Sequence, residues 1–417
     1  MSNKTDVLIV GAGPVGMLTA LALAQTGASV RVLEKEDDII NSPRAAVYFP
    51  STLVILEELG LLEELLEIGF TNRTFGTHIP EFGYHSVVVS EPIDGVDYDY
   101  QLHAGQDDVA RVAMKHARAL GVEVLFGHEV HGFEEYDDHI AVMTRTGGSE
   151  QLYQADWLIG ADGARSTVRK LAGIEFEGHT WPERFVATNV KFDFSKLGYC
   201  QANFVCDPVN MAVIAQLDRD GLWRCTYMED SSLPEDSYVE RIHQRYEYFM
   251  AGSKDYQIVS ANPYTLHQRA GETLHKGRIL LAGDAAHATN PCGGLGLTSG
   301  VWTGIILADV LGAVIRGEED ATILDRYSDE RRRIFWDIVT PAATENKRML
   351  QEQDMDQRLK DMAAIKALND DPDSGAMLML FAFKVIGDVL REGSRWADAD
   401  PTPRVALDLA GRKGQIH

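Results

Sequence analysis

Residues 6–17 read Asp-Val-Leu-Ile-Val-Gly-Ala-Gly-Pro-Val-Gly-Met, and this stretch decides the fold class of the chain. The apolar run 7–10 is too short for a helix and ends in glycine, which predicts a buried parallel strand. Gly11, Gly13 and Gly16 then form the pattern G-x-G-x-x-G. In this pattern the first glycine makes a tight turn and the second lets the backbone approach a pyrophosphate. The third lets the following helix pack closely on the strand.

A helix, a second strand and an acidic residue follow in the order that this motif requires. Residues 17–26 predict the helix, Gly27 its C-terminal stop and residues 29–33 the second strand. Glu34 ends that strand, where a carboxylate binds the two hydroxyls of an adenosine ribose. A glycine-rich turn without a ligand is the alternative, and the ordered context argues against it. Because Glu34 would repel a 2′-phosphate, we expect NAD or FAD rather than NADP, and the motif alone does not choose between them.

Composition and charge narrow the function classes. The chain has 417 residues with 39 Lys+Arg and 63 Asp+Glu, a net charge of −24, which disfavours nucleic acid and anionic membranes as partners. No apolar run of 18 residues and no signal peptide is visible, so we expect a cytoplasmic protein without a membrane partner. The cysteines lack metal-binding spacing, which predicts reduced, mostly buried thiols and no metal site. They are Cys200, Cys206, Cys225 and Cys292.

Beyond the motif, periodicity predicts alternating helical and extended segments. We expect an amphipathic surface helix over 53–66, strands of a second sheet over 74–99, a helix over 107–120 opened by Gln106, a three-strand meander over 122–155, and mostly β structure over 175–274 with a helix near 237–251.

Two later segments resemble residues 7–16, because each is a short apolar strand that ends in small residues. One is Trp157 to Ser166, and the other is Gly277 to His287, which leads into a glycine-rich loop and a long helix ending near Arg316. Glycines at a loop-to-helix junction expose N–H groups to a flat or anionic ligand. Beyond Pro341 the chain reads as mostly helical. An apolar helix over 377–390 fits either the core or a dimer face.

Three motifs in this order resemble the single-component flavoprotein aromatic hydroxylases, the 4-hydroxybenzoate hydroxylase-like group A monooxygenases. They are G-A-G-P-V-G with Glu34, G-A-D-G-A-R-S at 160–166, and L-A-G-D-A-A-H at 281–287 before Pro291, and the resemblance spans at least residues 5–315. It implies an α/β fold with a doubly wound FAD-binding domain, an interleaved mixed β-sheet substrate domain and C-terminal helices. We expect the FAD-binding domain at 1–73, 100–174 and 277–340, the substrate domain at 74–99 and 175–276, and the helical region at 341–417.

The resemblance also implies roles for individual residues. Glu34 is expected to hold the adenosine ribose, Arg44 a pyrophosphate or ribitol group, Gln106 the flavin, Val130 the adenine through its backbone, and Asp284 the ribitol. Asp162 and Gly163 match a pair associated with both the FAD pyrophosphate and the reductant. The segment from Pro291 to Thr298 is expected to line the isoalloxazine. The full set of expected cofactor contacts is Gly11, Gly13, Pro14, Val15, Gly16, Glu34, Lys35, Arg44, Gln106, Val130, Asp162, Gly163, Asp284, Pro291, Gly294, Gly296, Leu297 and Thr298.

The sequence departs from the family pattern near that last segment. The family often has Gln at the position of Leu295, Asn at that of Thr298, and an Asp-Ala pair where this chain has Trp302 and Thr303. These departures bear on the tuning of the flavin rather than on its binding.

The implied activity is hydroxylation of an electron-rich ring such as a phenol, a pyridine or a quinolone. FAD takes a hydride from NADH or NADPH, adds O₂ to form a C4a-hydroperoxide, and transfers electrophilic oxygen. No second G-x-G-x-x-G follows a strand, so NAD(P)H is expected to visit without a domain of its own. Two alternatives stay open at this point. One is a monooxygenase that modifies a polyketide or antibiotic, and the other is a flavin protein without turnover that sequesters an intermediate.

Substrate residues carry the weakest signals. Arg224 and Tyr227 stand in a predicted strand, where alternation puts them on opposite faces, so only one of them can face a pocket. Tyr264 and Pro291 are further substrate candidates. His287 is expected to be structural rather than a base, and no catalytic residue is assigned. The sequence lacks the Baeyer–Villiger signature and the flavin halogenase motif. The expected partners are a small aromatic substrate, O₂ and a second copy of the chain.

Overall fold

The computed structural model describes residues 4–40, 46–250, 252–371, 373–403 and 405. Its first sheet contains five parallel strands in the order β18-β11-β1-β2-β8, with the short antiparallel β17 beside β18. The chain winds outward from β1 in both directions, which is the predicted doubly wound order and places a ligand crevice at the carboxyl edge. The strands are β1 (Lys4–Val10), β2 (Val30–Leu33), β8 (Glu123–Leu125), β11 (Ser149–Gly160), β17 (His275–Lys276) and β18 (Ile279–Leu281).

Three helices form the layer packed with this sheet. They are α1 (Pro14–Gln25), α4 (Gln106–Ala119) and α7 (Leu295–Ile315), and α1 contacts both of the others. Glycines on α7 allow this close packing, since a Cβ at Gly304 would lie 2.2 Å from the Thr19 hydroxyl. By length and composition α7 alone among the described helices could cross a membrane, but 89% of its apolar window is buried inside the protein. A helix that is apolar all round belongs in a core.

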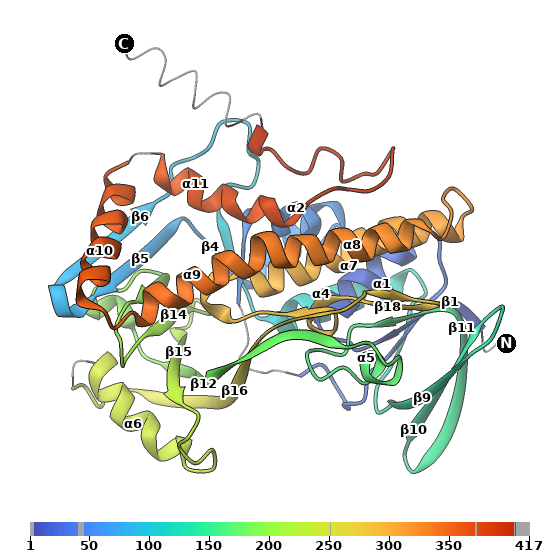
Figure 1. Ribbon diagram of the computed structural model, residues 1–417, viewed down its shortest axis with the longest axis horizontal. Helices are drawn as coiled ribbons and strands as arrows, with labels where there is room; N and C mark the ends of the chain where they lie inside the picture. Colours follow the sequence, from blue (N-terminus) through green and yellow to red (C-terminus); the bar gives the residue numbers. More distant parts are fainter. Residues whose placement is uncertain (1–3, 41–45, 251, 372, 404, 406–417) are drawn as a thin grey trace.

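The predicted meander differs from the structure in two respects. Strands β9 (Glu129–Glu135) and β10 (Ile140–Thr146) pair with each other and with β11. The first segment, β8, instead joins the parallel sheet beside β2. In addition, β11 is one strand that runs from the meander to the Gly160 tip, where the sequence suggested two. Figure 1 shows β9 and β10 projecting from the end of the first sheet that lies near the N-terminus.

The second sheet has the order β19-β16-β12-β15-β14-β13-β5-β6. One face is covered by α6 (Tyr238–Phe249), as predicted for the helical interruption, and Figure 1 shows α6 beside β12 and β15. The other face is turned toward the rest of the molecule. The strands are β5 (Thr74–Ile79), β6 (Tyr84–Val89), β12 (Phe176–Lys191), β13 (Ala202–Val205), β14 (Ala212–Gln216), β15 (Leu222–Asp230), β16 (Gln257–Gly271) and β19 (His287–Ala288), and the connections carry the 3-10 helices η1 (Pro80–Phe82) and η2 (Phe194–Leu197).

The predicted surface helix over 53–66 is wrong. The structure has two helices there, α2 (Pro50–Glu58) and α3 (Leu62–Ile68), and Gly60 between them has a φ of +74°. A left-handed residue ends a right-handed helix, and glycine adopts it without strain. Helix α2 is mostly buried, whereas α3 buries only Leu62 and Leu65. Both lie beside a third, small sheet of β3 (Val47–Tyr48), β7 (Gln101–His103) and β4 (Phe70–Asn72).

The C-terminal part is helical, as predicted, with different boundaries. Helix α8 (Ile323–Ile334), a π-helical segment η5 (Phe335–Val339) and α9 (Thr340–Gln351) run end to end as one rod in Figure 1. The expected boundary at 340/341 therefore falls inside a continuous helix. Next come α10 (Met355–Asp370), α11 (Ser374–Phe381) and the 3-10 turn η6 (Ala382–Val385), so the apolar helix predicted over 377–390 begins earlier and ends sooner.

Candidate functional site at the carboxyl edge of the first sheet

Four separated loops meet at one edge of the first sheet. The glycine-rich loop follows β1, Glu34 follows β2, Asp162 follows β11 after one residue, and Asp284 follows β18. These four strands are neighbours and parallel, so their carboxyl ends share an edge. Glu34 is tied to the glycine-rich loop, because its Oε2 accepts a 2.8 Å hydrogen bond from the Ala12 N–H. The structure thus brings together the motifs that the sequence placed far apart.

The three motif glycines have different surroundings. A Cβ at Gly11, which has a φ of +109°, would lie 2.4 Å from the Ala161 carbonyl oxygen, and one at Gly16 would lie 2.0 Å from the Gly11 oxygen. A Cβ at Gly13 would meet nothing within 4 Å. Gly11 and Gly16 are therefore glycine because the chain packs against them, whereas Gly13 faces open space.

The start of α1 is prepared for an anion. Its N-cap is Gly13, which supplies no side-chain cap, and its first turn contains no acidic residue. The first N–H groups of a helix have no intrahelical acceptor and carry the positive end of the helix dipole. The open space at Gly13 lies directly in front of them. This cradle fits the pyrophosphate of a dinucleotide.

Asp162 serves the scaffold in this structure. Its carboxylate accepts hydrogen bonds from the Ser166 hydroxyl at 2.5 Å and from backbone N–H groups at the start of α5 (Thr167–Leu171). Arg169 in that helix is buried, and its two Nη groups donate to the carbonyls of Ala285 and Ala164, each at 2.9 Å. Sequence reasoning gave Arg169 no role. It ties the loop after β11 to the loop after β18.

A buried glutamine of the second sheet fixes the loop before α7. Gln268 of β16 is fully buried, and its Oε1 accepts from the Thr289 hydroxyl at 2.9 Å and from the Asn290 amide at 3.2 Å. The 3-10 turn η4 (Pro291–Gly293) then leads to Gly294, the uncapped N-cap of α7. One turn into α7, the Thr298 hydroxyl is buried without a hydrogen-bond partner among the described residues. An uncapped helix start beside an unpaired hydroxyl fits a flat ligand that carries negative charge.

The structure gives the positions of the other predicted cofactor contacts except Arg44. Asp284 is exposed on the 3-10 turn η3 (Gly283–Ala285), and the Lys35 ammonium lies 3.4 Å from a Glu36 carboxylate oxygen. Arg44 lies outside the described residues. The remaining positions are Pro14 and Val15 at the start of α1, Gln106 as first residue of α4, Val130 in β9, Gly163 with a φ of +78°, and Gly296 and Leu297 in the first turn of α7.

The substrate candidates fall on different faces of the second sheet. Arg224 lies on the face opposite to α6, where Oδ1 of Asn189 on the neighbouring β12 accepts from its Nε and Nη2 at 3.1 and 3.0 Å. Burial lowers the pKa of Arg224 to about 10. Tyr227 packs in the core under α6, 6.1 Å from the Phe249 ring, on the face opposite to Arg224. Tyr264, beside Phe185 in the sheet register, shares the face of Arg224.

His287 is a structural residue, as the sequence suggested. Its Nε2 lies 2.8 Å from the Thr303 hydroxyl, and its ring stacks on Phe335 with centroids 5.2 Å apart. Burial, and then the charge of Arg331, lower the pKa of His287 to about 3. The ring is therefore neutral and enclosed in the physiological range, which does not suit a base that serves a substrate.

A cationic group lies near the loop after β11. Arg165 is exposed, and the Nε of Arg269 is buried without a hydrogen-bond partner in the described part of the chain. Burial, and then the charges of Arg269, Arg165 and Arg169, lower the pKa of His267, so these groups lie close together. In a chain of net charge −24, a local excess of positive charge favours an anionic visitor such as a dinucleotide.

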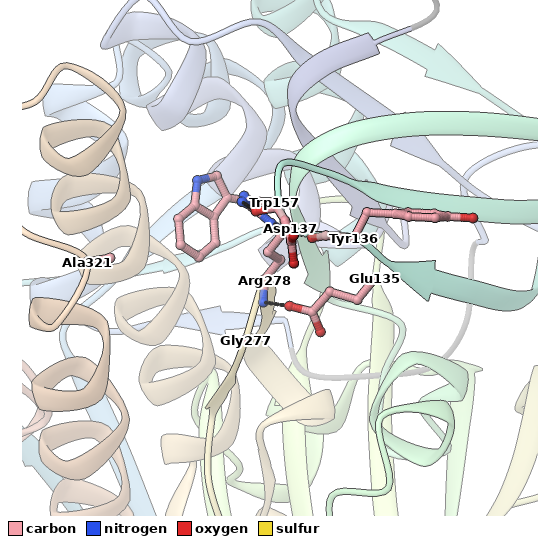
Figure 2. Close-up of a pocket in the computed structure, with 7 residues that line it drawn as sticks. All are labelled: Glu135, Tyr136, Asp137, Trp157, Gly277, Arg278 and Ala321. Atoms are coloured by element: carbon pink, nitrogen blue, oxygen red, sulfur yellow. Dashed lines mark hydrogen bonds between the residues drawn. The ribbon is translucent and has the colours of Figure 1, made fainter.

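A surface pocket of about 600 Å³ lies away from this edge (Figure 2). It surrounds Trp157 and Arg278, just before β18 begins. The Arg278 side chain donates to the carbonyls of Asp156 and Tyr136, and its backbone N–H donates to the Glu135 carboxylate at 2.7 Å, which Figure 2 shows as a dashed line. The polar groups of this pocket are engaged in holding the meander to β18, so we do not place the chemistry here.

Residues 4–342 match the family described as an FAD binding domain. The chain belongs to this family. It is 41% identical over 383 residues to para-nitrophenol 4-monooxygenase from Pseudomonas sp. strain WBC-3, covering 89% of this chain and 93% of that protein. It is 40% identical to 6-hydroxy-3-succinoylpyridine 3-monooxygenase HspB from Pseudomonas putida strain DSM 28022 / S16, covering 85% and 91%. The crystal structure of p-nitrophenol 4-monooxygenase PnpA from Pseudomonas putida DLL-E4 superimposes with a TM-score of 0.87 at 38% identity, covering 92% and 99%.

The family match decides between NAD and FAD as the bound nucleotide. The ribose acid and the glycine cradle fit either NAD or FAD, and this family binds FAD. With relatives of this identity and coverage, the chain is an FAD-dependent monooxygenase of the aromatic hydroxylase type, for which NAD(P)H is the usual reductant. The resemblance seen in the sequence and the predicted fold class are thereby confirmed.

Proposed function

We propose that this protein hydroxylates a small monocyclic phenol or hydroxypyridine, with NADH or NADPH as reductant and O₂ as co-substrate. The observation that carries the proposal is that Gln268 of the second sheet holds the loop before α7, which joins this sheet to the proposed FAD edge. The two relatives at 41% and 40% identity support it, because their names give a nitrophenol and a hydroxypyridine as substrates.

The cofactor contacts remain part of this proposal. We assign Glu34 to the adenosine ribose, the Gly13 cradle to the pyrophosphate and Asp284 to the ribitol. Supporting this assignment are the open space at Gly13 and the exposed position of Asp284 on the same edge. The Asp162 carboxylate already accepts hydrogen bonds from Ser166 and Thr167 at the start of α5. We therefore propose that the main task of this carboxylate is to shape the edge on which the cofactor binds.

The residues of the chain have separable tasks in this reaction. When bound, FAD accepts a hydride and activates O₂. The uncapped start of α7 stabilises negative charge on the flavin ring. Gln268 fixes the loop that carries this helix start, and the second sheet covers the site and excludes water. The guanidinium groups of Arg165 and Arg269 attract the phosphates of the visiting reductant.

Anaerobic stopped-flow reduction of the FAD-loaded protein tests this function. The panel contains 4-nitrophenol, a hydroxypyridine and a polycyclic aromatic polyketide. We expect a monocyclic ligand to accelerate flavin reduction by NADH or NADPH, and O₂ uptake then to yield hydroxylated product rather than H₂O₂. Acceleration by the polycyclic ligand alone indicates the polyketide alternative, and no acceleration by any ligand indicates a flavin protein without turnover.

We further propose a homodimer in the cytoplasm. Support for the location comes from the acidic composition and the four free cysteines. Support for the dimer comes from exposed apolar side chains on α11 and the neighbouring edge strand β6, including Met377 at 56% and Val89 at 53% exposure. Light scattering on the purified protein should give twice the chain mass of 46.1 kDa, and a mass of 46.1 kDa contradicts the dimer.

A further inference from the structure

Helix α9 packs along one side against the 3-10 turn η4, which leads into α7. A Cβ at Gly293 would lie 3.2 Å from the Ala343 Cα, so this turn lies directly on the helix backbone. One turn further along α9, the side-chain amide of Asn346 donates to the Cys292 carbonyl at 3.3 Å. Residues three or four positions apart share one side of a helix, so a single side of α9 supports η4.

The same helix is attached to the second sheet at both of its ends. At the start of α9, the Thr340 hydroxyl accepts a 2.8 Å hydrogen bond from Nε2 of Gln268 in β16. Near its end, the Leu350 carbonyl accepts a 2.9 Å hydrogen bond from the N–H of Asp207, which lies just beyond β13. The turn η4 and the second sheet therefore contact one rigid element, and α9 sets how they lie relative to each other.

A fully buried lysine lies in the middle of this contact. Lys347 is 0% exposed, and its Nζ donates to Oε2 of Glu183 at 3.0 Å and lies 4.2 Å from the centroid of the Trp181 ring. The Glu183 side chain is 22% exposed and also accepts from Gln351 at 3.3 Å. Lysine is almost never fully buried unless it is paired, because removing an ammonium group from water is costly. A lysine kept at this position therefore points to a need for the specific pairing.

The acceptor of this lysine stands in an irregularity of β12. In the pairing of β12 with β16, Thr180 lies opposite His267 and Arg184 lies opposite Thr265. Residues 181–183, which read Trp-Pro-Glu, therefore face a single residue of β16. Such a bulge re-aims side chains, and it accommodates a proline that has no N–H to donate. The bulge presents its indole and its carboxylate to the lysine of α9.

We propose that Lys347 is a positioning residue for the flavin site. Through Glu183 it fixes α9 on the β12 bulge, and α9 in turn fixes the loop before α7. The inference rests on the proposed contact between this loop and the flavin. Lys347 acts through the Cys292 carbonyl and the Gly293 backbone, because a shift of η4 moves the uncapped start of α7, whose dipole stabilises negative charge on the flavin ring.

The test uses two readouts that need no turnover, the Kd for FAD in titrations of the apoprotein and the visible absorption spectrum of the bound flavin. Lys347→Met removes the charge and leaves a carboxylate that water reaches. We expect an about 5-fold weaker Kd, the upper end of what one helix dipole contributes at a charged group, and a shifted flavin absorption maximum. Circular dichroism at the same temperature verifies that the variant is folded. The matched control is Arg348→Met, because Arg348 pairs with Glu345 and Asp361 instead. It should lower Tm and leave both flavin readouts unchanged.

A second pair of variants disturbs the same contact from the side of the loop. Gly293→Ala places a methyl group 3.2 Å from the Cα and Cβ of Ala343, which displaces η4 from α9. Both flavin readouts should change in the same direction as in Lys347→Met. Adding Ala343→Gly removes one of the two crowded atoms and should restore the readouts in part. An absence of rescue assigns the effect to a direct collision with the flavin and contradicts the role of α9.

The outcomes separate the inference from the proposals beneath it. If Lys347→Met binds FAD as tightly as the wild-type protein with the same spectrum, while Gly293→Ala alters both, the inference is wrong and the contact between loop and flavin stands. If neither variant alters either readout, the inference and that contact are both wrong. A wild-type protein whose flavin reduction no phenol or hydroxypyridine accelerates contradicts the proposed function alone, because these readouts require no substrate.

Discussion

The contrast between Gly13 and Gly16 gives the sharpest prediction. Gly13→Ala adds a methyl group to open space, and the φ of −69° and ψ of 175° at Gly13 suit any residue. The apoprotein should therefore keep or slightly gain stability, since a compatible Gly→Ala change contributes about 0.4–1 kcal/mol through the unfolded state. The methyl group nevertheless occupies the space from which a phosphate reaches the α1 N–H groups. One hydrogen bond to a charged group is worth about 1.5–3 kcal/mol.

That loss corresponds to about a 10- to 150-fold weaker Kd for FAD. In Gly16→Ala the new Cβ would lie 2.0 Å from the Gly11 carbonyl oxygen, so the backbone must move, which costs about 1–3 kcal/mol in folding. Urea unfolding of the apoproteins and fluorescence titration with FAD measure the two effects separately. If Gly13→Ala is folded and binds FAD as tightly as the wild-type protein, the phosphates do not bind at this loop.

Three further predictions concern the scaffold. Arg169→Met should lower the free energy of unfolding in urea by about 2–4 kcal/mol and weaken FAD binding, because two loop carbonyls lose a charged donor. An unchanged affinity for FAD would show that Arg169 does not support the cofactor site. Arg331→Met should release the C-terminal segment, since the fully buried Arg331 donates to the carbonyls of Ile386 and Val385, and limited proteolysis that finds this segment as resistant as before argues against the role. Burial lowers the pKa of His78, His103 and His287 to about 4, 4 and 3. Stability should therefore fall as the pH is lowered from about 6.5 toward 4, because the unfolded chain binds protons that these buried imidazoles do not bind in the folded chain. Urea midpoints that do not change with pH in this window would contradict burial as the cause of the low pKa values.

The loops of the FAD edge were predictable because their signals are local. Glycine spacing, a short apolar strand and a terminal acid occur within 30 residues, and parallel strands necessarily bring such tips to one edge. The helix over 53–66 failed because its apolar spacing outweighed Gly60, whose φ of +74° ends α2. Pro341 does not interrupt the helical rod, because it falls in the first turn of α9, where a missing N–H is tolerated.

The substrate side depends on contacts between distant strands, which the sequence does not display. Alternation put Arg224 and Tyr227 on opposite faces, but only the packing of α6 shows that Tyr227 is the one turned away. Asn189 carries no motif at all. It becomes visible through the hydrogen bonds that it accepts from Arg224. Trp302, where the family often has Asp, packs edge-on against Trp396 of the C-terminal segment, a contact between residues far apart in the chain.

The central claim is that the four loops at the carboxyl edge of the first sheet together hold one FAD. The most direct measurement is the flavin content of the purified protein after reconstitution, with the released flavin identified by mass and compared with protein concentration. The account predicts one FAD per chain for the wild-type protein. A folded wild-type protein that remains colourless after reconstitution with FAD would contradict it.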